Sequence, residues 1–172
     1  MTKYPFDLGS YTRRVTTSSD LCQIWFDRGF NWLFGFNHEE AAACFENAIA
    51  ADPDCAMAYW GVAYAIGPNY NKSWTHFDEV EMAIMLSKAR ITLALARKAA
   101  TKATGVEQAL VAALSKRFQV DSPVVDMAPW SDAYAAAMRC VHQQFPEDLD
   151  VVMLCVDALM NRTAWLMWDV RE

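Results

Sequence analysis

Apolar residues recur at three- and four-residue spacing along most of this chain, a pattern typical of amphipathic α-helices. No stretch alternates between apolar and polar residues for long enough to predict a sheet. The pattern predicts helices over residues 20–36, 37–51, 55–66, 78–103, 106–114 and 131–145, and a last one that begins at Pro146. We therefore expect an all-α protein of about seven antiparallel helices.

Short polar segments between these stretches contain the residues that begin and end helices. Asn37 offers an N-cap oxygen, with Glu40 three residues later, as in a capping box. Pro53 and Pro68 end the helices before them, because proline lacks the N–H that a helix interior needs. Residues 1–18 are rich in turn formers, so we expect an extended N-terminal arm followed by one helical domain over residues 19–172.

One of the predicted helices is apolar on more than one face. In the helix over residues 78–103, Ile84, Ile91 and Leu95 form a second apolar stripe beside the main one. We expect this helix to be sandwiched between neighbours. In the last helix, the residues expected to face inward are Val152, Cys155, Val156 and Leu159.

One window of about 34 residues places large, small and aromatic residues regularly over two helices. The first helix contains Trp25, Arg28, Gly29 and Trp32, the second contains Ala41, Phe45 and Ala48, and Pro53 follows at the turn. Small residues let two helices approach closely, and aromatic side chains fill the gap to the next pair. This pattern resembles the tetratricopeptide repeat (TPR), except that Arg28 stands where leucine is usual. Residues 19–53 match best, and residues 55–118 and 130–161 resemble degenerate repeats, which implies a TPR-like right-handed α-solenoid.

A more specific resemblance covers residues 36–71, which contain the strings FNHEEA, DPDCAMAYWG and GPNYN. They are similar to strings in a group of uncharacterised bacterial and fungal TPR-domain proteins. Members of that group are longer, so the chain resembles their N-terminal part. The resemblance implies the helical-repeat fold and no particular activity.

Composition narrows the class of protein and of partner. The 172 residues are 54% hydrophobic, which excludes a disordered chain. The net charge of −6 disfavours nucleic acid and anionic membranes as partners, since both attract a cationic surface.

The longest apolar run, residues 56–67, is too short for a membrane span, and the first residues have no apolar core of a signal peptide. Five widely spaced cysteines without a C-x-x-C pair are typical of buried thiols in a reducing compartment, so we expect a cytoplasmic protein.

An up–down array of helices places alternate connections at the same edge. The connections over residues 37–40, 67–77 and 119–130 share one edge with the exit of the last helix, and long loops on one face of a repeat array usually bind ligands. The candidate binding residues there are His38, Glu39, Asn69, Tyr70, Asn71, Lys72, Trp74 and His76. In the alternative interpretation, the asparagines satisfy the loop backbone and Trp74 packs into the core.

Metal binding and catalysis find little support in the sequence. His38, Glu39 and His76 are zinc or iron ligand types, but no His-x-x-x-His or Glu-x-x-His pair is present. A capped helix start with a solvated His38 explains the same residues, so we expect no metal cofactor. The sequence contains neither a G-x-S-x-G motif nor a glycine-rich phosphate loop, so no motif identifies a catalytic residue.

Two further groups of residues suggest contact surfaces. Arg28, Trp32 and Tyr64 are candidates for a concave groove, or alternatively for hydrogen bonds between helices. The apolar C-terminal end contains Val151, Leu154, Trp165, Leu166 and Trp168. Solenoids need a polar cap, so we expect this end to be covered by a second copy in a homodimer or by downstream repeats.

These observations favour a protein-interaction or scaffold module that associates with itself. The alternatives are a small-molecule-binding protein or enzyme with a site at the loop edge, and a structural fragment of a longer protein. Peptide-binding TPR grooves are usually lined by basic residues and asparagine, whereas the first helices here contain a single basic candidate, Arg28. That counts against a clamp for an acidic tail and leaves an apolar ligand or helix as the occupant.

Overall fold

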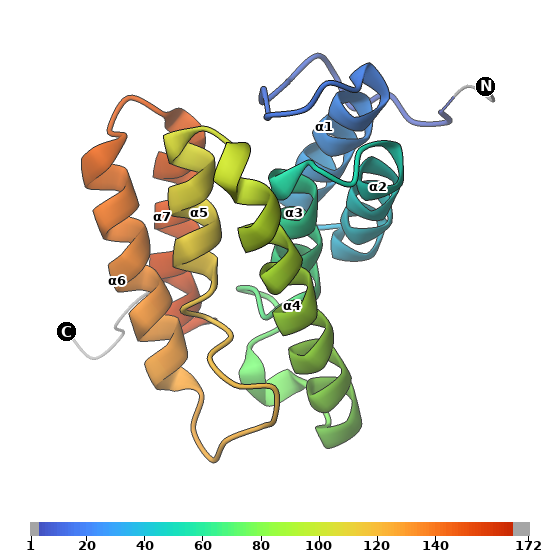
Figure 1. Cartoon of the computed structure of the whole chain (residues 1–172). Coiled ribbons are helices and arrows are strands. Elements are labelled where there is room, and N and C mark those ends of the chain that lie inside the picture. The colour runs from blue at the N-terminus through green and yellow to red at the C-terminus, as the bar shows by residue number, and fades with distance from the viewer. Residues whose placement is uncertain (1–3, 167–172) are drawn as a thin grey trace.

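The computed structural model of the chain, described for residues 4–166, is entirely helical (Figure 1). In this range the α-helices are α1 (Asp20–Phe34), α2 (His38–Ala51), α3 (Ala56–Ile66), α4 (Glu79–Ala99), α5 (Gly105–Leu114), α6 (Ala128–Gln144) and α7 (Leu149–Met160). Three short 3₁₀ segments follow loops or helix ends: η1 (Trp74–His76), η2 (Ala100–Lys102) and η3 (Asn161–Thr163). The described residues contain no strand, so the prediction of an all-α fold is confirmed.

The seven helices form an up–down array in which neighbours in sequence pack together. α2 packs between α1 and α3, α3 packs on α4, and α6 packs between α5 and α7. α3 also contacts α1 and α5 and is therefore the central helix. In Figure 1, the connections before α2, α4 and α6 lie at the lower ends of the helices that they join, and α7 also ends on this side.

Several helix ends are where the local residues predicted them. Ser19 Oγ accepts a hydrogen bond from the backbone N–H of Cys22 at 3.2 Å, and Asn37 Oδ1 accepts one from Glu40 at the same distance. α6 begins earlier than predicted, at Ala128, because Pro129 lies in its first turn, where a missing N–H costs nothing. α4 ends at Ala99 because the last predicted turn adopts the tighter 3₁₀ geometry of η2.

The side chain of Phe45 joins the first three helices. It is buried in α2, and its ring faces Gly29 of α1 and Gly61 of α3. A Cβ atom at Gly29 would lie 2.8 Å from the ring, and one at Gly61 would lie 2.5 Å from it. Both distances are shorter than van der Waals contact, so the aromatic ring fits only because these two positions lack a side chain.

The outer stripe of α4 is on the surface of the described chain, which corrects the prediction of a sandwiched helix. Ile84 and Ile91 are 64% and 62% exposed, and Leu95 is also exposed. The inner face of α4 alone packs on α3 and α5. One apolar stripe therefore builds the core, and the other is available for contacts outside this chain.

The face of α7 that points inward also differs from the prediction. Its buried residues are Val151, Leu154, Cys155 and Ala158. Val156, predicted to face inward, is exposed together with Leu149 and Met153. α7 is apolar nearly all round, so its sequence offers two stripes of the same period. Packing on α6 selects the stripe that contains Val151 and Leu154, and these two residues are thus not part of an exposed C-terminal end.

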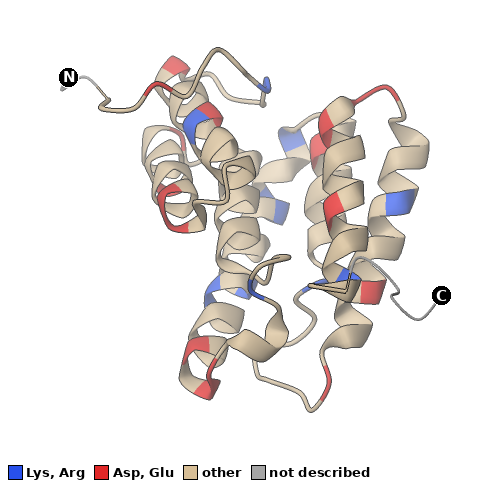
Figure 2. Ribbon diagram, turned by 180° about the vertical axis from the view of Figure 1, so that it is seen from behind, with Lys and Arg blue, Asp and Glu red and all other residues tan. Residues whose placement is uncertain are grey.

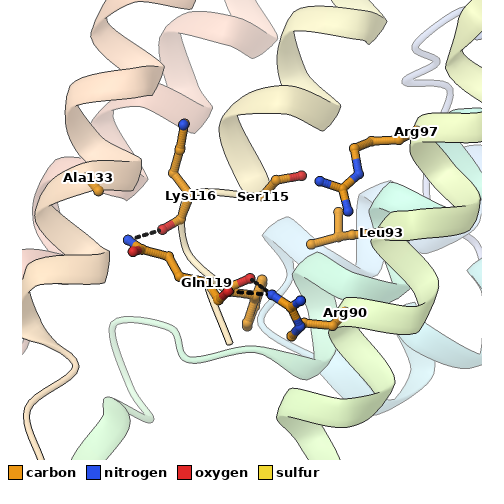
Figure 3. A pocket seen from close by; sticks show the side chains of 8 residues that line it. Arg90, Leu93, Arg97, Ser115, Lys116, Gln119 and Ala133 are labelled. Carbon is orange, nitrogen blue, oxygen red and sulfur yellow. Dashed lines mark hydrogen bonds between the residues drawn. The ribbon is translucent and has the colours of Figure 1, made fainter. Parts of the chain in front are cut away.

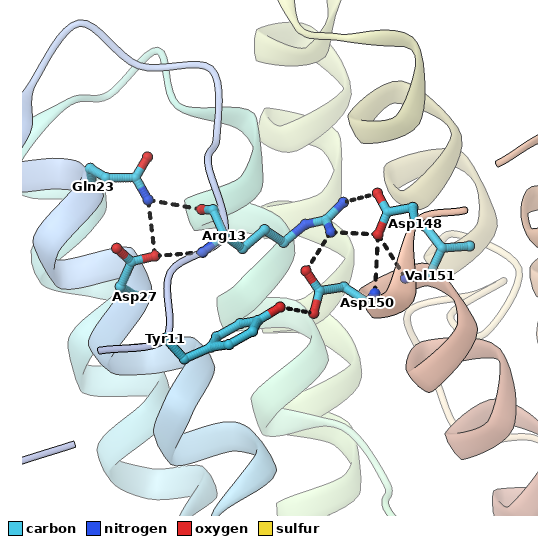
Figure 4. A network of polar contacts seen from close by, with 7 residues as sticks. All are labelled: Tyr11, Arg13, Gln23, Asp27, Asp148, Asp150 and Val151. Carbon is cyan, nitrogen blue, oxygen red and sulfur yellow. Dashed lines mark hydrogen bonds and ion pairs between the residues drawn. The ribbon is translucent and has the colours of Figure 1, made fainter. Parts of the chain in front are cut away.

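The N-terminal arm, described from residue 4 to residue 18, has no helix and connects distant parts of the array. Figure 4 shows Arg13 of the arm between α1 and the start of α7. Its guanidinium is paired with Asp148 at 2.8 and 2.9 Å and with Asp150 at 2.6 Å. On the other side, its backbone N–H donates to Asp27 and its carbonyl accepts from Gln23. The arm thereby ties the first helix to the last one.

A second contact ties the arm to α5. The backbone N–H and the hydroxyl of Thr16 donate to the carboxylate of Glu107 at 2.7 and 2.5 Å. The same carboxylate accepts from Thr104, whose hydroxyl caps α5 in a full capping box. Glu107 is buried, and its oxygens are satisfied by these four donors. The arm is therefore part of the folded structure over its described length.

Two further predictions concern the environment of the chain. Within residues 4–166, no helix is both long and apolar enough to cross a membrane. All five cysteines are free; four are buried as predicted, and Cys140 is exposed.

Candidate functional site

A groove of about 1180 Å³ runs between α2 and α4. Its walls are the N-terminal halves of these two helices, and the end of α3 and the α3–α4 loop form its floor and one end. Five of the predicted loop-edge residues line it: His38, Glu39, Asn69, Asn71 and Lys72. Tyr70, Trp74 and His76 do not line it, and neither does the loop over residues 119–130. The structure therefore brings two of the three predicted loops together.

The groove is apolar at its floor and along part of its rim. Apolar side chains contributed by α2, α3 and α4 include Ala42, Ala65, Ile66 and Met85. At the rim, Phe36, Val80 and Ile84 are exposed by 65%, 70% and 64%. Large apolar side chains at a concave surface are typical of binding sites, because they lose contact with water when a partner covers them.

The side chains that line the groove have a net negative charge. Four carboxylates line it, those of Glu39, Glu46, Asp78 and Glu81, against two lysines. Lys88 is paired with Glu46 at 2.6 Å, and Lys72 is paired with Glu81. In Figure 2, acidic residues are visible at the first turns of α2 and α4. Two carboxylates are thus left without an ion pair among the described residues, and the groove favours a cationic partner.

The α3–α4 loop is held by its own asparagine. Asn69 Oδ1 accepts hydrogen bonds from the backbone N–H groups of Asn71 at 2.9 Å and Lys72 at 3.0 Å. The backbones of Asn69 and Lys72 also exchange two hydrogen bonds. The Lys72 ammonium lies 4.2 Å from the centre of the Phe77 ring. Asn69 therefore serves the loop itself, whereas the Asn71 side chain has no partner in the described chain.

Trp74 attaches the same loop to α6. Its indole N–H donates to Ser131 Oγ at 2.9 Å, and its ring meets Trp130 and Phe118 edge-on. This is the structural role that was the alternative interpretation of Trp74. Tyr70 lies against Trp165, with ring centres 5.9 Å apart, and so contacts the segment after α7.

The two candidate histidine ligands have different surroundings. His38 lines the groove, and its Nδ1 lies 3.3 Å from the carbonyl oxygen of Phe36. Burial lowers the pKa of His38 below its ordinary value. His76 is exposed, and its Nδ1 lies 3.0 Å from Ser73 Oγ. Residues 4–166 contain no group of three His, Cys, Asp or Glu side chains placed to hold a metal ion.

The N-terminal arm covers two of the three residues predicted to line a concave groove. The guanidinium of Arg28 lies between the rings of Tyr4 and Trp25, at 4.0 and 4.5 Å from their centres. The indole N–H of Trp32 donates to the hydroxyl of Tyr4 at 2.7 Å. Arg28 and Trp32 therefore bind the arm of their own chain, which corrects the expectation of an open groove at this place.

Tyr64, the third groove candidate, belongs to a buried polar cluster that the sequence analysis missed. Its hydroxyl donates to Asp157 of α7, which also accepts from Asn161. Arg117 is 1% exposed, has no ion pair in the described chain, and lies 6.0 Å from the Tyr64 ring and 5.2 Å from the Tyr134 ring. Burial raises the pKa of both tyrosines. A charged residue in the interior of an otherwise apolar helix, such as Asp157, is the signal that would have pointed to this cluster.

The predicted interface at the C-terminal end is described only in part. Trp165 and Leu166 are exposed, and Trp165 has a positive φ of 63°. Trp168 lies outside the described residues. Self-association through this end stays a prediction.

Comparison of the chain with protein-family models, with curated proteins and with solved structures finds no match. The site is therefore interpreted from its own geometry and charge.

Proposed function

We propose that this chain is a protein-interaction module that binds a basic amphipathic helix of a partner protein in the α2–α4 groove. The observation that carries this proposal is an apolar groove with two carboxylates, those of Glu39 and Asp78, that form no ion pair within the described chain. A helix with apolar residues on one side contacts the floor, and its Lys and Arg residues lie beside Glu39 and Asp78.

We also infer that the helix pairs are TPR-like repeats arranged in a right-handed solenoid. The approach of Gly29 and Gly61 to Phe45 supports this inference, since small residues around an aromatic ring are the packing that the repeat pattern requires. The up–down order of the helices agrees with it. In such arrays, grooves and long loops on one side are the usual binding surfaces.

The test measures binding of a labelled model peptide to the full chain. The probe is a fluorescein-labelled 14-residue peptide made of two LKKLLKL units, which forms a basic amphipathic helix. We expect saturable binding, and Ile84→Asn is expected to weaken it at least tenfold, because it replaces an apolar contact with a neutral polar side chain and leaves the charge of the groove unchanged. Ile84 is exposed in the free chain, so this variant is expected to remain folded.

Ile91→Asn is the matched control, because Ile91 is about as exposed on α4 but does not line the groove. We expect this variant to bind the peptide within twofold of the unmodified chain. An acidic LEELLEL counterpart is expected to bind poorly. Equal loss in both variants, or equal affinity for the two peptides, would contradict the proposal.

A further inference from the structure

A second cavity lies on a different face of α4, between this helix, the end of α5 and α6 (Figure 3). Its volume is about 580 Å³. Every charged side chain that lines it is cationic: Arg90 and Arg97 from α4, and Lys116 after α5. The chain has 21 acidic and 15 basic residues, so its composition does not predict a cavity whose charged side chains are all basic. None of the three forms an ion pair within residues 4–166.

Arg90 is held in place by the backbone that follows α5. Its Nη1 donates to the carbonyl oxygens of Phe118 and Gln119, at 3.2 and 2.5 Å. These bonds fix the plane of the guanidinium and leave its other nitrogens without a hydrogen-bond partner in the described chain. Figure 3 shows Arg97 two turns further along α4, with its guanidinium toward Ser115. Two guanidinium groups therefore line one side of the cavity, and one of them is already oriented.

The chemistry of the cavity selects an anion with several charged oxygens. Three uncompensated cations beside a low-dielectric wall create a positive potential that concentrates anions. Guanidinium groups bind phosphate through two parallel hydrogen bonds, and a phosphate monoester carries about −1.5 to −2 charges, against one for a carboxylate. Leu93 and Ala133 add apolar wall, and the cavity is larger than a phosphate group requires. We propose that this basic pocket binds the phosphate group of a phosphorylated small molecule.

The test is calorimetric titration of the full chain with pyrophosphate and with inorganic phosphate, at low ionic strength. We expect saturable binding of one ligand per chain, tighter for pyrophosphate because of its higher charge. Arg97→Gln and Lys116→Gln are each expected to weaken binding about tenfold, the size of one charge-assisted hydrogen bond. Both side chains are exposed, so the variants are expected to keep the melting temperature of the unmodified chain.

Lys98→Gln is the matched control, since Lys98 adjoins Arg97, is exposed and does not line the pocket. This variant removes the same charge and is expected to bind pyrophosphate within twofold of the unmodified chain. Succinate, a dicarboxylate, is expected to bind at least tenfold more weakly. The proposal is overturned if the chain does not bind pyrophosphate, if Lys98→Gln weakens binding as much as Arg97→Gln, or if succinate binds equally well. The pocket and the α2–α4 groove use different residues, so each proposal is tested independently.

Discussion

Phe45 illustrates how single residues set the distance between helices in this protein. Its ring occupies a space that two neighbouring helices leave open only at Gly29 and Gly61. Glycine inside a helix costs about 1 kcal/mol relative to alanine. Glycine at these positions is therefore explained by close packing and not by helix propensity, and the cost is offset by burying an aromatic side chain between three helices.

At the residue scale, Gly61→Ala is expected to lower the free energy of unfolding by about 1–3 kcal/mol. The added methyl group would lie 2.5 Å from the Phe45 ring, so the ring or a helix must shift. Urea denaturation measures this effect. Gly105→Ala is the matched control, because its Cβ would meet only Phe145, at 3.8 Å, and it is expected to be neutral or slightly stabilising. Equal destabilisation by both substitutions would contradict the packing argument.

At the scale of elements, the N-terminal arm takes the place that a concave binding surface was predicted to have. Tyr4 contacts Arg28 and Trp32, and further along the arm Arg13 reaches α7. Arg13 is only 8% exposed, and its charge is compensated by two aspartates at the start of α7. Removing one partner leaves the remaining charges buried and uncompensated. This loss of stability is larger than the net stabilisation that the ion pair provides.

Arg13→Ala is therefore expected to lower the free energy of unfolding by about 3–5 kcal/mol. The same variant is expected to speed amide hydrogen exchange in residues 11–18, because the arm loses its attachment to α7. Arg14→Ala is the control, since Arg14 is exposed and has no ion pair in the described chain. A loss below about 1 kcal/mol for Arg13→Ala would mean that the arm is held mainly by its other contacts.

At the scale of the whole molecule, the ends of the array are joined by ionised groups, so stability depends on pH. Burial by itself would raise the pKa of Asp148, but hydrogen bonds and attraction from Arg13 outweigh it and hold this pKa below its ordinary value. For Glu107, burial is likewise outweighed by hydrogen bonds from Thr16 and Thr104, and the pKa is lowered. Both carboxylates stabilise the fold above their unfolded pKa values, of about 3.9 and 4.3, and this stabilisation is lost as the pH falls through the folded values.

The free energy of unfolding is therefore expected to decrease as the pH is lowered from about 5 to 3, as measured by urea denaturation at each pH. His38 adds a separate decrease that begins near pH 6.5, since burial lowers its folded pKa and the unfolded chain binds the proton first. In Arg13→Ala, the decrease below pH 5 is expected to be shallower, because Asp148 loses the partner that lowers its pKa. Arg14→Ala is expected to retain the full decrease. The same slope in both variants would show that Asp148 does not carry the effect.

The helices and most of their ends follow from local information. Asn37 and Ser19 cap helices through hydrogen bonds to residues three positions away, and Pro53 ends one, so neighbouring residues suffice to predict these sites. Apolar periodicity identified the seven helices for the same reason. It was ambiguous only in α4 and α7, where two apolar stripes compete and the packing of neighbouring helices selects one.

The sites depend on contacts between residues far apart in the chain, which local patterns do not contain. The spacing of the loops predicted that His38 and Lys72 share an edge, but the groove they line exists only because α2 and α4 both pack on α3. Arg13 pairs with Asp148, which is 135 residues away in the sequence. One cavity is lined by Arg90, Arg97 and Lys116 because α4, α5 and α6 pack together. The sequence alone thus determined the all-helical fold and the edge at which its loops lie. The tertiary structure decided which side chains are covered by the arm and which remain free to bind, because that choice depends on how the helices pack.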